Sequence, residues 1–250
     1  MTTVTEVAPG VHLVSRAAVN CYLIEDDDGL ALIDAGVPAM WRQLGEAIRS
    51  LGHRPRDLRA PALTHAHFDH VGLARRLQER LDLPVWAHPE DHRLAAHPYR
   101  YAHENPRAAY PVKHPAAVPI LLRVAAAGAL CVRGVELDRV RSLVPGRELP
   151  VPGRPQVLAT PGHTYGHVAL HLPDRDVVLS GDALVTLDPY TGRTGPRIVA
   201  GAATADSALN LRTLDAVAGT GAGTVLPGHG APWRQGAAAA VALAREAGPA

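Results

Sequence analysis

Short apolar runs that alternate with polar positions divide the first third of the chain into predicted strands and helices. Three such runs between residues 11 and 34 predict strands. Asp26–Gly29 lies between the last two and predicts a hairpin turn, because Asp and Gly tolerate positive φ. Residues 37–51 are predicted to be helical, since Pro38 suits a first helical turn and Gly52 follows the last one.

A second succession of strand and helix follows and surrounds a group of polar residues. Residues 60–64 form a short apolar run, which predicts a strand leading into that group. Asp69 suits the N-cap of a helix, and the apolar positions after it predict that this helix continues to about Leu81. Residues 84–87 predict one more short strand.

The stretch from about residue 88 to 147 differs from the rest, because it carries many prolines, aromatics and histidines before an apolar run. It predicts an insertion that is helical in part and packs on the main fold. Strands return at 156–160, 168–172, 177–180 and 224–226, with helices at 209–218 and 237–247. Strands and helices thus alternate in two rounds, which predicts an α/β sandwich with two similar halves in one domain, 1–250.

Composition removes several classes of function. The formal net charge is +1, and Lys113 is the only lysine, so no general attraction to nucleic acid or to an anionic membrane is expected. No uninterrupted apolar stretch of about 18 residues predicts a membrane span. Residues 1–10 lack the features of a signal peptide, so we expect a cytoplasmic protein. Cys21 and Cys131 are too few for a disulfide framework, and Cys21 is expected to be a buried free thiol.

Four side chains that commonly bind metals fall within six positions: His65, His67, Asp69 and His70. In an extended chain His65 and His67 project to the same side. Asp69 and His70, at the expected turn into the helix, can face a second point, so that one segment serves two metal ions. Histidine nitrogen and carboxylate oxygen suit zinc. The alternative is a polar loop with surface histidines, because short motifs also occur by chance.

Three later segments each place one more such residue after a strand and a glycine: His163, Asp182 and His229. A glycine–histidine pair is by itself more often structural than metal-binding. Together with the first group, however, the three segments supply what a site for two metals still lacks.

These motifs resemble, in type and order, those of the metallo-β-lactamase superfamily, over residues from about 11 to 233. The resemblance implies a four-layer αββα sandwich with the site at one edge of two packed sheets. It also implies two groups of three ligands and one bridging carboxylate: His65, His67 and His163; Asp69, His70 and His229; and Asp182.

The resemblance further implies a metal-dependent hydrolase with two ions, expected to be Zn²⁺, with other divalent metals such as Fe or Mn as alternatives. Two ions about 3.5–4 Å apart lower the pKa of a shared water, and the resulting hydroxide attacks a carbonyl. Asp69 is the expected catalytic residue, which orients this nucleophile and passes its proton to the leaving group.

Four further residues are expected near the site. Asp34 resembles a family position that orients metal-bound imidazoles, although it could simply be a turn residue. His167 resembles a position that lies close to the site without binding metal, and a structural role is its alternative. Tyr165 and Tyr190 could donate a hydrogen bond to an oxyanion, or could only pack. We also expect the insertion, with its tyrosines and histidines, to border the active-site cleft.

The expected substrate is a small ester, lactone or thioester. Asp182 stands where β-lactamases of this superfamily usually carry Cys or Ser, so the glyoxalase II and lactonase branches are the better match. No basic cluster that would hold glutathione is evident in the sequence. The alternative is an oxidoreductase that resembles persulfide dioxygenases, with one iron. A nucleic-acid-processing enzyme is disfavoured by the near-neutral charge, and a non-catalytic protein by the complete ligand set; the oligomeric state stays open, a homodimer included.

Overall fold

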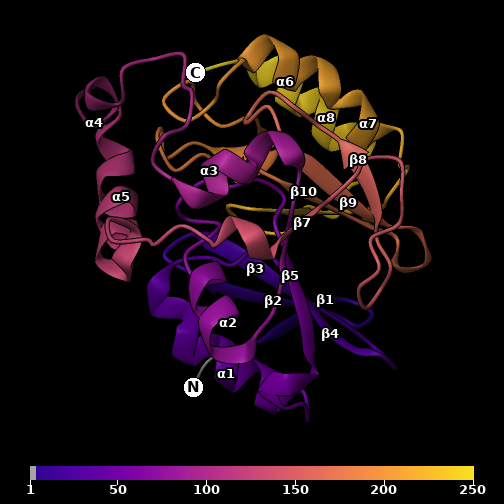
Figure 1. Ribbon diagram of the computed structural model, residues 1–250. Helices are drawn as coiled ribbons and strands as arrows, with labels where there is room; N and C mark the ends of the chain where they lie inside the picture. The colour runs from indigo at the N-terminus through magenta and orange to yellow at the C-terminus, as the bar shows by residue number, and fades with distance from the viewer. Residues whose placement is uncertain (1–3) are drawn as a thin grey trace.

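Two main β-sheets lie face to face between two layers of helices in the computed structural model, which describes residues 4–250 (Figure 1). The first sheet has the strand order β1-β2-β3-β4-β5-β6-β7. Strands β1 to β4 are antiparallel, and β4 to β7 are parallel. Their bounds are β1 Thr5–Ala8, β2 Val11–Arg16, β3 Val19–Asp26, β4 Gly29–Ile33, β5 Leu58–Ala62, β6 Val85–Ala87 and β7 Val140–Ser142.

The second sheet has the order β13-β10-β9-β8, and a separate two-stranded sheet joins β11 to β12. Strand β13 is parallel to β10, whereas β9 is antiparallel to both of its neighbours, β10 and β8. The bounds are β8 Gln156–Ala159, β9 Val168–Leu172, β10 Val177–Gly181, β11 Val185–Leu187, β12 Thr194–Arg197 and β13 Thr224–Pro227.

The α-helices are short, and α8 is the longest of those in the described chain. Their bounds are α1 Trp41–Ser50, α2 Ala74–Leu81, α3 His92–Ala96, α4 Tyr110–Lys113, α5 Val118–Val124, α6 Ser207–Thr213, α7 Asp215–Ala218 and α8 Ala237–Ala247. Turns of 3₁₀ helix occupy Pro38–Met40, Pro55–Asp57, Pro89–Asp91, Arg107–Ala109, Pro115–Ala117, Leu137–Arg139 and Pro173–Arg175, and a π turn occupies Ala125–Ala129. Figure 1 shows α1 and α2 on one side of the paired sheets and α6, α7 and α8 on the other.

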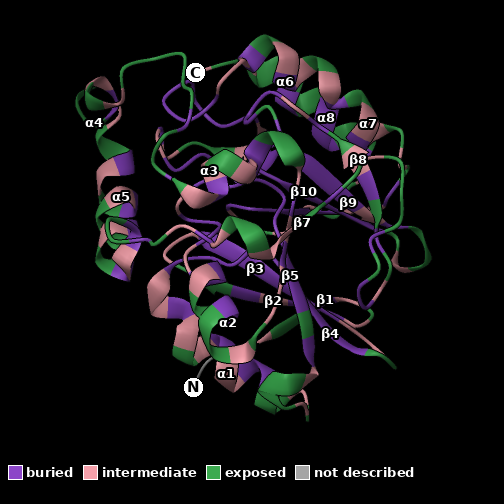
Figure 2. Ribbon diagram, viewed as in Figure 1, coloured by how far each residue is buried: buried purple, intermediate pink, exposed green. Residues whose placement is uncertain are grey.

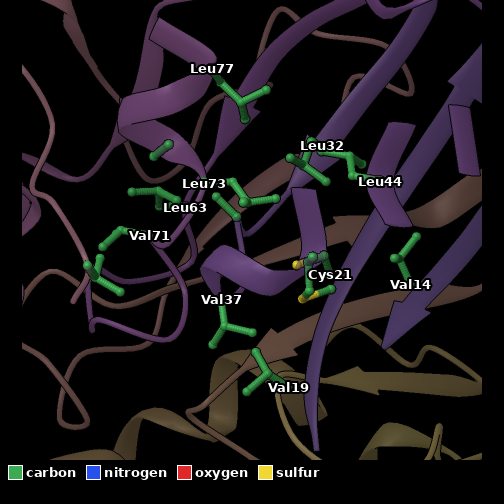
Figure 3. Close-up of a cluster of buried hydrophobic side chains, with 14 of the residues drawn as sticks. Val14, Val19, Cys21, Leu32, Val37, Leu44, Leu63, Val71, Leu73 and Leu77 are labelled. Atoms are coloured by element: carbon green, nitrogen blue, oxygen red, sulfur yellow. The ribbon is translucent and has the colours of Figure 1, made fainter. Parts of the chain in front are cut away.

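Strand β3 is buried on both faces, because successive side chains of a strand point in opposite directions. Cys21 and Leu23 face the core that includes Leu44 of α1 (Figure 3). Tyr22 and Ile24 face the core between the two sheets. The continuous apolar run of β3 therefore reflects a strand covered by helices on one side and by a sheet on the other.

The second sheet repeats this arrangement. Leu170 of β9 points into the core between the sheets, whereas Ala169 joins the core formed with Val217 of α7 and Val241 of α8. Figure 2 shows the central strands as buried and the outer helix faces as exposed. The order of layers is thus helix, sheet, sheet, helix, and the predicted αββα sandwich is confirmed.

Most of the predicted elements are present, including the helix after Val37, the closing helix 237–247 and the hairpin at Asp26–Gly29. Cys21 is a buried free thiol, as expected, and Cys131 is exposed. Strands β1, β7, β11 and β12 were not predicted. Among the described residues, no helix is both long and apolar enough to cross a bilayer.

The helix that follows the histidine motif begins at Ala74, so the prediction that Asp69 is its N-cap is wrong. The backbone before Ala74 hydrogen-bonds to the turn after β4 instead of forming an intrahelical ladder. The N–H of Gly72 donates to the carbonyl of Gly36 at 2.7 Å, and the N–H of Leu73 donates to Ala35 at 2.9 Å. A side chain at Gly72 would meet the Gly36 carbonyl oxygen at 2.3 Å, so this close approach requires glycine.

Residues 88–147 contain α3, α4 and α5 and are helical in part, as the sequence predicts. Ala95 and Val124 pack into the core under the first sheet. The segment also contributes β7, an edge strand that pairs with β6, so its last part belongs to the sheet itself. Figure 1 shows α4 and α5 at the outer side of the molecule.

Candidate metal centre

The seven predicted ligands lie in loops that follow the ends of strands in both sheets. His65, His67, Asp69 and His70 follow β5, His163 follows β8, Asp182 follows β10, and His229 follows β13. All seven are buried, and Asp69 is the most exposed at 8%. Their ligand atoms form three groups, within each of which the atoms lie within 4.8 Å of one another: His65, His67 and His163; His65, His70 and Asp182; Asp69, His70 and His229.

The carboxylate of Asp182 lies between the two predicted triads. Its Oδ2 atom is 3.5 Å from Nε2 of His163 and 3.1 Å from Nε2 of His229. Its Oδ1 atom is 3.6 Å from Nε2 of His70. One carboxylate therefore faces histidines of both triads, which is the position that a bridging ligand needs.

Several buried polar atoms of this cluster have no hydrogen-bond partner within residues 4–250: His65 Nε2, His67 Nε2, His70 Nε2 and Asp182 Oδ1. Buried polar atoms are normally paired, because an unpaired one loses its hydration without compensation. Imidazole nitrogens together with carboxylate oxygens are a donor set that zinc and other divalent transition metals accept. The residues present therefore fit a pair of divalent cations.

Hydrogen bonds on the outer ring nitrogens fix the orientation of four imidazoles. In each case Nδ1 has a partner, and Nε2 is left to face the cluster. The partners are Thr64 Oγ1 for His65 (3.1 Å), Asp34 Oδ2 for His70 (3.0 Å), Thr204 Oγ1 for His163 (3.2 Å) and the Ala18 carbonyl for His229 (2.7 Å). His67 instead turns Nδ1 toward Nε2 of His163, at 3.0 Å.

Asp34 lies directly behind His70, at the place expected from the sequence. Its carboxylate accepts hydrogen bonds from the backbone N–H of Thr64 (2.8 Å) and from the Thr64 hydroxyl (2.9 Å). Asp34 is buried and has a backbone φ of 59°, which is uncommon for a residue other than glycine. Asp34 therefore joins the turn after β4 to the start of the histidine motif.

Burial and the neighbouring charges set the protonation of the cluster. Burial holds the pKa of His65 and His67 well below the usual value, and it lowers the pKa of His163 to about 4. These imidazoles are neutral at pH 7 and have lone pairs available. Burial opposes a charge on His70, but the carboxylates of Asp182 and Asp34 outweigh it and raise its pKa to about 10. The carboxylates of Asp182 and Asp34 thus favour positive charge at their side of the cluster.

His167 lies against the site without facing it. Its ring stacks on that of His65, with 5.1 Å between the ring centres. Nε2 accepts hydrogen bonds from the backbone N–H groups of Asp182 (3.0 Å) and Ala183 (3.1 Å), and Nδ1 pairs with the Thr160 hydroxyl. Both ring nitrogens are engaged, so His167 supports the loop of Asp182.

The two predicted tyrosines occupy different surroundings. Tyr165 is 56% exposed and lines a cavity beside His163. The hydroxyl of Tyr190 is 3.3 Å from that of Tyr101, whose ring packs on His67 with 4.1 Å between the ring centres. Tyr101, a residue of the insertion, thus contacts a predicted ligand. Among the described residues, the histidines of the insertion belong to none of the three groups.

Asp91 is a residue of the site that the sequence did not predict. Its buried carboxylate accepts hydrogen bonds from the loop of His65 and His67 and from the loop of His163. Nothing in the local sequence distinguishes it from other acidic residues of the insertion, because both partners come from distant segments.

Comparisons with known proteins agree with this geometry. A model of the metallo-β-lactamase superfamily matches residues 14–229. YflN of Bacillus subtilis, described as a probable metallo-hydrolase, is 31% identical over 188 residues, which cover 73% of this chain and 67% of YflN. The metallo-β-lactamase family protein TTHA1429 from Thermus thermophilus superposes with a TM-score of 0.68 at 29% identity, covering 96% of this chain and 79% of that one. TTHA1623, solved in a di-iron-bound form, gives a TM-score of 0.59 at 32% identity, with 87% and 90% covered.

Proposed function

This chain belongs to the metallo-β-lactamase superfamily, and from that membership we propose that it is a dinuclear metal-dependent hydrolase of a small ester, lactone or thioester. The observation that carries the proposal is the position of Asp182, whose two oxygens face histidines of both triads. A site for one ion would need only one of the triads. Relatives described as metallo-hydrolases support the reaction class.

When bound, two divalent ions supply Lewis acidity and a water of lowered pKa. The residues of the chain then hold the reacting groups. Asp69 is the most exposed member of the set, and its Oδ2 atom is 3.5 Å from Nε2 of His229. That carboxylate can orient a water at the edge of the cluster and carry its proton to the leaving group. The phenol of Tyr190 is a donor for the substrate oxygen.

Zinc is the proposed metal, since histidine and carboxylate ligands suit it. Iron is the principal alternative, because the similar protein TTHA1623 has a di-iron-bound form. The proposed substrate class rests on Asp182. β-Lactamases of the superfamily usually have another residue at this position, so an ester, lactone or thioester is proposed instead of a β-lactam.

Metal analysis combined with a substrate screen tests the proposal. The protein purified without added metal is analysed for zinc, iron and manganese, then loaded with each and assayed against lactones, thioesters, simple esters and a β-lactam. We expect two metal ions per chain and hydrolysis of at least one of the first three classes. A single iron with oxygen consumption on a persulfide, or no hydrolysis with two metals bound, would overturn it.

A further inference from the structure

A cavity of about 290 Å³ lies next to the predicted metal centre, between the insertion and the loop of His163. Its walls include Arg93 of α3 and Arg100 on one side and Thr164 and Tyr165 on the other. The volume is at the lower end of the range for ligand pockets, so the cavity suits a short chain.

The two arginines of this wall are unpaired. Neither guanidinium makes a hydrogen bond or an ion pair with any residue of the described chain, 4–250. Other arginines of the fold do have carboxylate partners, as Arg75 has in Glu79 and Arg245 in Asp215. Two arginines that line one cavity therefore have guanidinium groups available to a ligand.

The acidic residues of the same wall do not pair with either arginine. The carboxylate of Asp91 is buried, and its oxygens accept three hydrogen bonds from the backbone and from Thr164. Glu90 is the other acidic side chain of the lining, so the formal charges of the two arginines and the two carboxylates balance. Because the carboxylate of Asp91 is directed to the two loops, neither arginine has an ion-pair partner in the wall.

Tyr101 connects the cavity to the metal centre. It lines the cavity, and its ring packs on His67. The guanidinium carbon of Arg107 lies 3.9 Å from the centre of the same ring. A molecule in the cavity thus contacts both His163 and the tyrosine that covers His67.

We propose that this cavity binds a carboxylate at the end of the substrate's acyl chain, through Arg93 and Arg100. The inference rests on the proposed function and narrows its substrate class to esters or thioesters of short dicarboxylic acids. Arginine suits this task, because its planar fork matches a carboxylate with two parallel hydrogen bonds. Tyr101 and Tyr165 then flank the methylene groups between the two ends.

Two 4-nitrophenyl esters that differ at the far end of the acyl chain test the proposal: 4-nitrophenyl hydrogen adipate, which ends in a carboxylate, and its uncharged methyl ester. In the metal-loaded wild type we expect kcat/KM for the anionic ester to exceed that for the neutral one about tenfold, as hydrogen bonds to charged groups allow. In the variant Arg93→Gln/Arg100→Gln this ratio falls to near one through a rise in KM for the anionic ester. The control Arg147→Gln removes one positive charge at a residue outside the cavity, and it should leave the ratio of the two kcat/KM values unchanged.

A ratio near one in the wild type, or an unchanged ratio in the double variant, overturns the inference. If neither ester is hydrolysed, the result counts against the proposed function. Calorimetry of adipate binding to the purified protein then tests the inference independently of hydrolysis. Binding that the double variant loses supports it. No binding, or equal binding in both proteins, refutes it.

Discussion

The hydroxyl of Thr164 donates a hydrogen bond of 2.8 Å to the buried carboxylate of Asp91. The same carboxylate accepts hydrogen bonds from the backbone N–H of Ala66 at 3.0 Å and of Gly166 at 3.1 Å. Ala66 lies between His65 and His67, and Thr164 follows His163. One side chain thus joins the loops that carry the whole of the first predicted triad.

We therefore expect Asp91→Asn to weaken metal binding. The amide keeps the shape of the side chain but replaces one acceptor oxygen with an NH₂ donor. This donor would face an N–H or O–H group, so one hydrogen bond would be lost. Loss of a group that orients metal ligands typically lowers affinity about 10- to 100-fold. Titration against a chelating dye measures this affinity, and thermal unfolding of the metal-free protein measures stability separately.

Asp26→Asn is the matched control for this change. Asp26 also accepts two backbone hydrogen bonds, from Gly153 at 2.6 Å and Asp28 at 2.8 Å, but it lies in the β3–β4 hairpin. The substitution Asp26→Asn should lower the melting temperature of the protein without changing its metal affinity. Equal loss of affinity in both variants would show that Asp91 acts through general stability alone.

Asp182→Asn should lower the metal content to less than two ions per chain and reduce hydrolysis at least about 100-fold. The amide removes the negative charge that faces His70, His163 and His229 together. Elemental analysis and kcat/KM under excess zinc check the two effects. Full activity with two bound ions would contradict the bridging role.

Glu25 predicts a dependence of stability on pH away from the site. Its carboxylate pairs with Nε2 of His53 at 2.7 Å and of His12 at 3.2 Å. Partial burial opposes the charge on Glu25, but the two histidines outweigh it and lower its pKa below 4.5. A carboxyl group whose pKa is lower in the folded than in the unfolded state stabilises the fold at pH values above its unfolded-state pKa. This stabilisation is lost as the pH falls through the folded-state pKa.

Glu25→Gln should therefore melt at a lower temperature than wild type above pH 4.5, and the difference should shrink as the pH falls below that value. Melting curves from pH 7 to 3 provide the measurement. Glu246→Gln, an exposed residue near the C-terminus, should show no such difference. A gap that stays constant down to the lowest pH would refute the ion-pair explanation.

Leu32→Ala should destabilise the fold by about 2–5 kcal/mol, since truncation of a fully buried leucine leaves a cavity. Leu32 of β4 is 0% exposed and points into the core beneath α1 and α2 (Figure 3). Leu122→Ala, at a side chain that is 65% exposed, should change stability by less than about 0.5 kcal/mol. Urea unfolding of the two variants gives the comparison.

The sequence by itself predicted an α/β sandwich and the residues of the candidate metal centre, and the resemblance of its motifs to a known superfamily added the four layers and the grouping of the ligands. Successive side chains of β3 and β9 point to opposite faces, because a strand has a period of two. The continuous apolar run of β3 therefore indicates that both of its faces are covered. The histidine motif and the three later ligands stand after strands, and strand ends meet at one edge of the paired sheets. These features depend on local order along the chain, which the sequence states directly.

Only the tertiary structure decided how the ligands are held and what lies beside them. The late start of α2 depends on Gly72 meeting Gly36, a contact that overrides the local preference for a helix at Asp69. Asp91 finds its partners 25 and 73 positions away, at Ala66 and Thr164. The cavity gathers Arg93 and Arg100 against the loop of His163. Contacts between segments so far apart leave no periodic or local signal, because each residue's role depends on a neighbour that the folded chain alone supplies.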